Sequence, residues 1–166
     1  FAADFSRATV VTMYLLPEVN LQLRPRLLYE LSPGTRVVSH DFDLGDWEPD
    51  DRMTVPVPDK TVGRYKESTL FLWTVPARLA GHWRGTLTGP EGDEPVLIEF
   101  MQRYQEVRAT VHLRRATLQG TGYLRGASLL LDLKRSGLAG PPSLLLALTI
   151  ADGRLDVAVA GGAEAP

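Results

Sequence analysis

The sequence predicts an α/β segment followed by an all-β segment, and two patterns support this fold class. Residues 9–50 have the pattern of a buried strand, an amphipathic helical region, a second strand and an acidic loop. From Gly81 onward, short alternating apolar and polar runs are separated by glycine-rich turns, which is typical of an antiparallel meander. We therefore expect half of an α/β domain over residues 1–79, a small β-barrel or sandwich over residues 80–161 and a disordered tail over residues 162–166.

The first strand is predicted at Thr9–Leu16, an apolar run with several β-branched side chains. The run is too short for a helix, and its composition favours a strand that is buried on both faces. Such a strand normally lies inside a parallel sheet, with neighbours on both edges and helices on both faces. This chain supplies too few of these elements, so we expect it to leave a sheet edge open to pairing or aggregation.

A helical region follows this strand. Pro17 and Glu18 suit a first helical turn, where proline needs no hydrogen-bond partner and glutamate complements the exposed N–H groups. Proline in mid-helix costs about 3 kcal/mol, so Pro25 predicts two short helices instead of one. The second helix starts at Pro25 and carries an apolar stripe formed by Leu27, Leu28 and Leu31.

The second strand is predicted at Thr35–Asp41, with Val37 and Val38 buried. Ligands of open α/β sheets bind beyond the carboxyl ends of the strands. We therefore expect the functional site at Tyr14–Pro17 and Ser39–Phe42.

Three sequence motifs in this region carry a resemblance to a known family: ATVVTMYLLPEVN, LSPGTRVVSHDF and GDWEPD. Over roughly residues 1–76 the chain resembles the second half of class I, seven-strand S-adenosylmethionine-dependent methyltransferases. It is most similar to the Dot1-like and the mitochondrial ATP-synthase c-subunit lysine methyltransferases. The resemblance implies a partial Rossmann-like sheet, S-adenosylmethionine as cofactor and a protein lysine or a small molecule as methyl acceptor. It also implies that Glu67–Pro76 belongs to the antiparallel pair that closes the sheet.

The chain departs from this family pattern at its beginning. Members of the family carry a glycine-rich loop after their first strand and an acidic residue after their second strand, and this chain has neither. We expect the sequence to be a carboxyl-terminal piece of a longer methyltransferase. We expect this piece to be inactive when it is alone. A missing N-terminal segment or a second copy of the chain would then cover the open sheet edge.

The resemblance also implies a set of cofactor-binding residues, which carry over by position only. Phe1 matches the aromatic residue that flanks the adenine in relatives. Tyr14, Leu15, Leu16 and Pro17 would form walls of the cofactor and acceptor pocket. Relatives often place an amide or acidic side chain in this segment, where this chain has Leu-Leu-Pro.

His40 and Asp41 are the candidate catalytic residues, because they end a strand at the expected ligand-binding edge. A neutral histidine beside a carboxylate can act as the general base that polarises an acceptor amine. The alternative is a histidine whose ring packs against the neighbouring helix. His82 and His112 have no metal-ligand spacing, so no metal site is predicted.

An acidic stretch follows the second strand. Its simplest interpretation is a solvated loop, and the alternative is a surface that attracts a cationic acceptor such as a lysine side chain. Trp47 is interpreted as a packing anchor, and the alternating prolines of Thr54–Asp59 predict a connector or lid without helix or central strand. The acidic residues are Asp41, Asp43, Asp46, Glu48, Asp50 and Asp51.

The composition excludes several classes of function. A net charge of −2 and a pI near 5.9 argue against nucleic-acid binding, which needs a basic footprint. The absence of cysteine removes disulfides and thiolate metal sites, and no apolar run reaches the length of a membrane span. We expect a cytoplasmic protein.

The predicted β domain contains about six or seven strands, in which Ile98 and Phe100, or Leu131 and Leu133, share one apolar face. A filled interior is the expectation for so small a barrel, and a ligand cavity is the alternative. Two functions therefore compete with the methyltransferase interpretation for the whole chain. One is a non-enzymatic binding or interaction module built on the β domain, and the other is purely structural association through the sheet edge.

Overall fold

The structure is a computed structural model that describes residues 3–61, 65–89, 92–135, 144–151 and 153–159. The chain forms two compact units, Phe1–Pro76 and Ala77–Pro166. Phe1, which the resemblance places beside the adenine, and the predicted tail at residues 162–166 lie outside the described residues.

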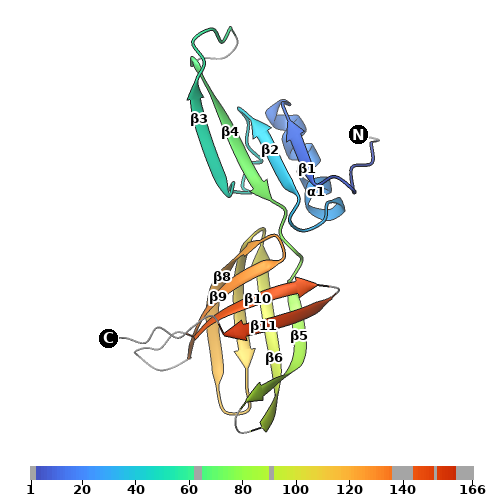
Figure 1. The fold of residues 1–166 in the computed structure, drawn as a ribbon, viewed down its shortest axis with the longest axis vertical. Helices are drawn as coiled ribbons and strands as arrows, with labels where there is room; N and C mark the ends of the chain where they lie inside the picture. Colours follow the sequence, from blue (N-terminus) through green and yellow to red (C-terminus); the bar gives the residue numbers. More distant parts are fainter. Residues whose placement is uncertain (1–2, 62–64, 90–91, 136–143, 152, 160–166) are drawn as a thin grey trace, which may run out of the picture. The chain divides into compact units, whose positions relative to one another are not determined.

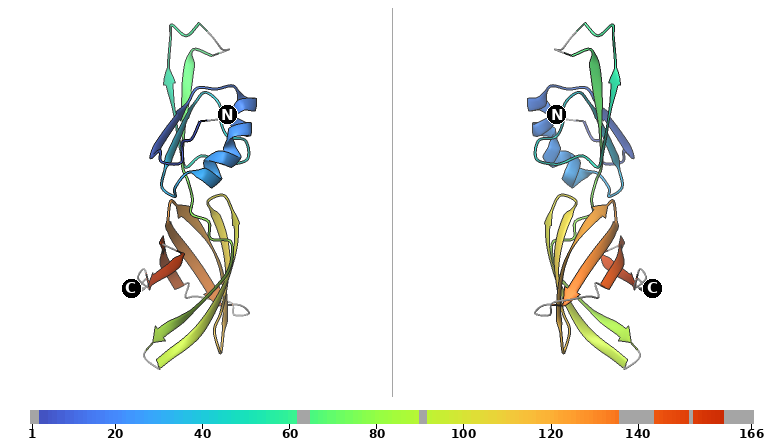
Figure 2. Two further views of the ribbon diagram at one scale, coloured as in Figure 1. Left: turned by 90° about the vertical axis from the view of Figure 1, so that its right-hand side faces the viewer. Right: turned by 90° about the vertical axis from the view of Figure 1, so that its left-hand side faces the viewer.

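Unit 1 is a mixed four-stranded sheet with one helix, α1 (Pro17–Glu30). The sheet has the order β1-β2-β4-β3; β1 and β2 run parallel, and β4 is antiparallel to both of its neighbours. Figure 2 shows α1 against one face of this sheet. The strands are β1 (Val10–Met13), β2 (Arg36–His40), β3 (Asp51–Pro56) and β4 (Glu67–Thr74).

The core of unit 1 lies on the face that α1 covers. Leu23 and Leu27 of α1 are buried, as are Val37 of β2 and Trp73 of β4, which are paired in register. The Trp73 indole N–H donates to the Trp47 carbonyl oxygen at 2.8 Å, and both tryptophans are fully buried. Trp47 is therefore a packing anchor, as the sequence indicated.

The first strand is shorter and more exposed than the sequence predicted. It ends at Met13, and of its four residues only Met13 is buried. Among the described strands β1 pairs with β2 alone, so the expected burial on both faces is wrong for this chain. Burial of both faces requires neighbours that the described residues do not supply.

Two predictions based on proline are also wrong. α1 continues through Pro25 as a single helix. Pro25 removes the bond to the Leu21 carbonyl, and both residues lie on the exposed side of the helix, where water can satisfy that oxygen. Residues 54–56 belong to β3 and not to a connector, although the predicted absence of a helix and of a central strand is confirmed, because β3 is an edge strand. A strand at the edge of a sheet tolerates Pro56, because the missing N–H costs no ladder bond on its open side.

Unit 2 is one antiparallel sheet of seven strands in the order β11-β10-β9-β8-β7-β6-β5. In Figure 1 the β10–β11 hairpin crosses in front of β5 and β6, so the sheet curls over its own apolar face. The result is a half-barrel, because the described parts of β5 and β11 do not pair. The strands are β5 (Gly81–Gly89), β6 (Gly92–Arg103), β7 (Glu106–His112), β8 (Thr117–Arg125), β9 (Ser128–Arg135), β10 (Leu144–Ala151) and β11 (Arg154–Val159).

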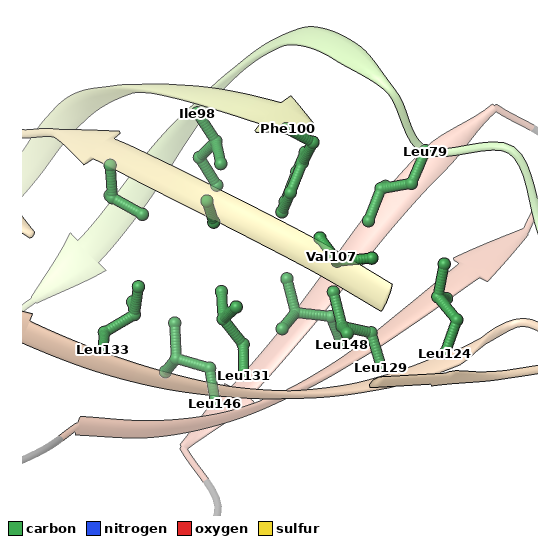
Figure 3. Packing of buried hydrophobic residues seen from close by; sticks show 12 residues of the cluster. Leu79, Ile98, Phe100, Val107, Leu124, Leu129, Leu131, Leu133, Leu146 and Leu148 are labelled. Atoms are coloured by element: carbon green, nitrogen blue, oxygen red, sulfur yellow. The ribbon is translucent and has the colours of Figure 1, made fainter. Parts of the chain in front are cut away.

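The interior of the half-barrel is filled by apolar side chains. Ile98 and Phe100 of β6 face the leucines of β9 across the core, as Figure 3 shows. The alternation predicted for these strands is confirmed in β9, because Leu131 and Leu133 are buried whereas Leu130, on the opposite face of the same strand, is exposed. The filled interior agrees with the expectation for a small barrel.

Two glycines of β8 allow the backbone of β9 to approach closely. Gly120 and Gly122 stand at inward-facing positions of β8, opposite Leu133 and Leu131. A Cβ atom on Gly120 would lie 1.8 Å from the Asp132 carbonyl oxygen, and one on Gly122 would lie 2.4 Å from the Leu130 carbonyl oxygen. The backbone of β9 therefore occupies the space that side chains would fill, which permits the strong coiling of the sheet.

Candidate functional site

The carboxyl ends of β1 and β2 lie side by side, because the two strands are parallel and Met13 is paired with Ser39. The next residues along each strand are Tyr14 and His40. Their rings are in edge-to-face contact, with centroids 4.5 Å apart and planes inclined at 74°. The structure thus brings together two residues that the sequence placed at the same edge of the sheet.

The segment between β1 and α1 presents apolar surface to solvent at this edge. Tyr14 and Leu16 are about two-thirds exposed, at 65% and 64%, and Leu15 is 36% exposed. Pro17 is the first residue of α1, and no side chain caps the helix at Leu16. Exposed aromatic and aliphatic groups grouped in this way suit the ring of a ligand or the stem of a long side chain.

Asn20 connects the first turns of α1 to the end of β2, a role that the sequence analysis missed. Its side-chain amide donates to the Ser39 hydroxyl and to the carbonyl oxygens of Phe42 and Asp43, each at 3.2 Å. Asn20 is fully buried, and its Oδ1 atom has no partner among the described residues. A signal existed in the sequence, because Asn20 lies at helical spacing on the same face as Leu23.

Asp41 follows β2 and is fixed to β4 by its backbone and by one carboxylate oxygen. Its N–H donates to the Thr69 carbonyl at 2.7 Å, and its Oδ1 accepts the Thr69 N–H at 2.9 Å. Its backbone lies in the left-handed region with φ 63°, which aspartate tolerates better than most residues. Asp41 is therefore held in one orientation by a central strand of the sheet.

The second carboxylate oxygen of Asp41, Oδ2, accepts a hydrogen bond from the Lys60 ammonium, with 2.5 Å between Nζ and Oδ2. Burial by itself would raise the pKa of Asp41. The hydrogen bonds from Lys60 and Thr69 and the charge of nearby His40 outweigh burial and hold the pKa below its ordinary value of 3.8. Nothing in the sequence singled out Lys60, because it has no motif and lies 19 residues away along the chain.

His40 and Asp41 do not form the hydrogen-bonded pair that a base and its orienting carboxylate would make. The His40 Nδ1 atom lies 3.8 Å from Asp41 Oδ2, beyond hydrogen-bond distance, whereas that oxygen receives Lys60. The aromatic partner of His40 is Tyr14. A catalytic role for His40 and Asp41 therefore stays a prediction.

Several residues of the acidic stretch have partners within unit 1. Asp46 forms a 2.5 Å ion pair with Arg24, and the Asp50 carboxylate accepts the Thr74 N–H at 2.5 Å. The side chain of Asp46 remains about half exposed. The stretch is thus a folded loop with a solvated surface, in which some carboxylates serve structural contacts.

Other features bear on metal and membrane binding. Within the described ranges, no group of three or more histidine, aspartate or glutamate side chains is placed to hold a metal ion. His82 and His112 lie 3.5 and 3.8 Å from the same oxygen of Glu99, on the exposed face of three neighbouring strands. No helix in the described part of the chain is long and apolar enough to cross a membrane.

Comparisons with known proteins single out the region around this edge. Residues 1–51 match the family model of the ANTKMT methyltransferase domain. A protein-lysine N-methyltransferase from Saccharolobus islandicus (strain REY15A) is 54% identical over 75 residues, which is 45% of this chain and 43% of that protein. The chain thus spans less than half the length of this relative.

A solved structure also shares sequence with the chain. It is an RNA methyltransferase from Salinibacter ruber in complex with S-adenosyl-L-homocysteine, with 52% sequence identity, 48% coverage of this chain and 45% coverage of that chain. The TM-score is 0.38, too low for the structural likeness to bear on the fold. The first part of the chain is therefore similar to methyltransferases in sequence, and the range that the family model matches contains Tyr14–Pro17, His40 and Asp41.

Proposed function

We propose that this chain forms part of an S-adenosylmethionine-dependent methyltransferase that modifies lysine side chains of proteins. The observation that carries the proposal is the family match over residues 1–51, which contains β1, α1, β2 and the whole edge where Tyr14 and His40 meet. The lysine acceptor is supported by the relative from Saccharolobus islandicus, which is named a protein-lysine N-methyltransferase.

The architecture of unit 1 supports a class I, Rossmann-like assignment. Parallel strands joined by a helix, as in β1–α1–β2, are the repeating unit of such sheets. The antiparallel strand β4 lies between β2 and β3, in agreement with the closing pair that the resemblance implied. Ligands of these sheets bind beyond the carboxyl ends of the parallel strands, where the aromatic pair lies.

The edge fits part of a cofactor site. Tyr14, Leu15 and Leu16 provide exposed walls for the adenosyl or methionine portion, and Phe1, outside the described residues, is proposed to flank the adenine. The chain lacks the glycine-rich loop that would hold the methionine end. We therefore propose that a further segment, pairing along the open edge of β1, completes the site.

The chemistry asks for orientation more than for acid–base groups. The cofactor supplies a methyl group on a sulfonium, which is a strong electrophile. The protein has to align the acceptor nitrogen with it and let that nitrogen arrive uncharged. We propose that His40, which is partly exposed beside Tyr14, receives the proton that the acceptor lysine loses.

The proposal is tested by methyl transfer from tritium-labelled S-adenosylmethionine. The chain, extended upstream through any preceding strands, is incubated separately with lysine-rich peptides and with RNA. We expect label that acid hydrolysis recovers as methyllysine. Tyr14→Ala should lose most of this activity, whereas Tyr29→Ala, at an equally exposed tyrosine near the other end of α1, should keep it.

Two outcomes would overturn the proposal. Label in RNA and none in peptides would assign a different acceptor. No label in either, from a protein that is folded by circular dichroism, would remove the enzyme assignment.

A further inference from the structure

The Lys60 ammonium is held between two acceptors at the ligand-binding edge of unit 1. Its Nζ atom lies 2.5 Å from Asp41 Oδ2 and 2.6 Å from the carbonyl oxygen of Glu67. The side chains of Lys60 and Asp41 are only 15% and 17% exposed. A carboxylate and a carbonyl at these distances make a specific cradle for a primary ammonium group, which has three donors to place.

The two acceptors belong to the rigid part of the sheet. Asp41 directly follows β2, Glu67 begins β4, and these are the two inner strands of the four. Paired hydrogen bonds with Thr69 fix both the backbone and the carboxylate of Asp41. The cradle therefore does not depend on Lys60 for its shape and is preorganised for an ammonium group.

Lys60, which occupies the cradle, lies outside the strands of the sheet. Lys60 lies in the connection between the edge strand β3 and β4, where residues 57–61 extend past the ends of β1 and β2 (Figure 1). Its backbone N–H donates to the carbonyl of Val57 at 3.0 Å within a local turn. A donor on such a connection can withdraw while the acceptors on the inner strands stay in place.

The surroundings of the cradle suit the rest of a lysine side chain. His40 Nδ1 lies 3.8 Å from the Asp41 carboxylate, and the His40 ring contacts the exposed ring of Tyr14. An aliphatic stem that arrives over Tyr14 and His40 would place its ammonium at Asp41. Aromatic faces also attract ammonium groups.

We propose that Asp41 and the Glu67 carbonyl form the binding site for the ammonium group of the acceptor lysine, and that Lys60 occupies this site in cis. The inference rests on the proposed function, because it names the place where the acceptor is recognised. Lys60 competes with the acceptor, so an incoming lysine has to displace it. The step is recognition of the charged group, before the nitrogen loses its proton.

The test measures binding of Nα-acetyl-lysine methylamide by the whole chain, followed at the backbone amide of Thr69 by NMR. Lys60→Gln removes the competing ammonium and should bind this probe at least tenfold more tightly than the unmodified chain. Lys66→Gln is the matched control, because it makes the same change in charge on the same connection. The Lys66 ammonium donates to the backbone carbonyl of Lys60 and not to Asp41. Adding Asp41→Asn to Lys60→Gln should abolish the gain.

A measurement on the unmodified chain covers the case in which Lys60→Gln does not fold. Butylammonium should displace Lys60 and shift the Thr69 amide, whereas tetramethylammonium, which has no N–H donor, should not. Equal effects of the two cations, or equal affinity of Lys60→Gln and Lys66→Gln for the lysine probe, would overturn the inference.

Titration with S-adenosylhomocysteine on the upstream-extended chain separates this inference from the proposed function. If the extended chain binds the cofactor and Lys60→Gln leaves the affinity for the lysine probe unchanged, the proposed ammonium site is wrong and the methyltransferase proposal stands. Ammonium binding at Asp41 without cofactor binding would do the reverse.

Discussion

Gly120→Ala is the substitution with the most clearly defined cost in unit 2. The added Cβ atom would lie 1.8 Å from the Asp132 carbonyl oxygen, 2.7 Å from its carbon and 3.0 Å from Leu133 Cα. All three are backbone atoms of the paired strand β9, so no flexible side chain can yield. To reach even 3.0 Å from the oxygen, the two backbones would have to separate by about 1.2 Å.

That separation breaks the β8–β9 ladder locally and opens the packed core behind it. Loss of two ladder bonds costs about 2 kcal/mol. Overpacking strain of about 1–3 kcal/mol adds to this loss. We therefore expect Gly120→Ala to destabilise unit 2 by about 3–5 kcal/mol, which lowers the midpoint of thermal unfolding by at least about 12 °C for a unit of this size.

Gly85→Ala in β5 is the matched control. A Cβ atom on Gly85 would meet only Val96 Cγ1, at an ordinary distance of 3.8 Å. Since alanine is favoured over glycine in strands by about 0.5–1 kcal/mol, this variant should be neutral or slightly stabilised. The assay is thermal unfolding by circular dichroism, with hydrogen exchange of the β9 amides to report unit 2 alone. Equal midpoints for the two variants would refute the close approach of β8 and β9.

Two further predictions concern the candidate site. Asn20→Ala should destabilise unit 1 by about 1–3 kcal/mol, because the carbonyls of Phe42 and Asp43 lose a buried donor; urea unfolding beside the exposed-position control Gln22→Ala checks this. Asp41 has a pKa lowered by folding, so its charged form stabilises unit 1 above about pH 4, and this stabilisation is lost as the pH falls through the folded-state pKa. Urea midpoints from pH 7 to pH 3 should therefore fall less steeply for Asp41→Asn than for the unmodified chain.

Each of these two predictions has a contradicting result. An Asn20→Ala midpoint equal to that of Gln22→Ala would show that the amide does not secure the loop after β2. Parallel pH profiles for Asp41→Asn and the unmodified chain would show that the Lys60 and Thr69 contacts do not favour the charged carboxylate.

Local patterns predicted most of the strands correctly, because burial acts on them residue by residue. The spacing of Ile98 and Phe100 on either side of the polar residue Glu99 indicates which face of β6 is buried, whatever the topology of the sheet. The helix break predicted at Pro25 and the connector predicted over residues 54–56 were wrong, because the cost of a proline depends on solvent exposure and on position in the sheet. Neither property is written in the local sequence.

The candidate site was predictable in part. Tyr14 and His40 were placed at one edge because parallel strands bring their carboxyl ends together. The contact between Lys60 and Asp41 was not predictable, because it depends on how the connection between β3 and β4 folds back. Asn20 left a weak signal as a polar residue on the buried face of a helix, which indicates a hydrogen-bonded role without naming the partners.

The central claim is that the edge formed by β1 and β2 is half of an S-adenosylmethionine site. Calorimetric titration with S-adenosylhomocysteine tests it most directly, on the chain alone and on a form extended upstream through any preceding strands. We predict binding by the extended form, weakened by Tyr14→Ala, and none by the chain alone. Absence of binding by both folded forms would contradict the claim and shift attention to unit 2.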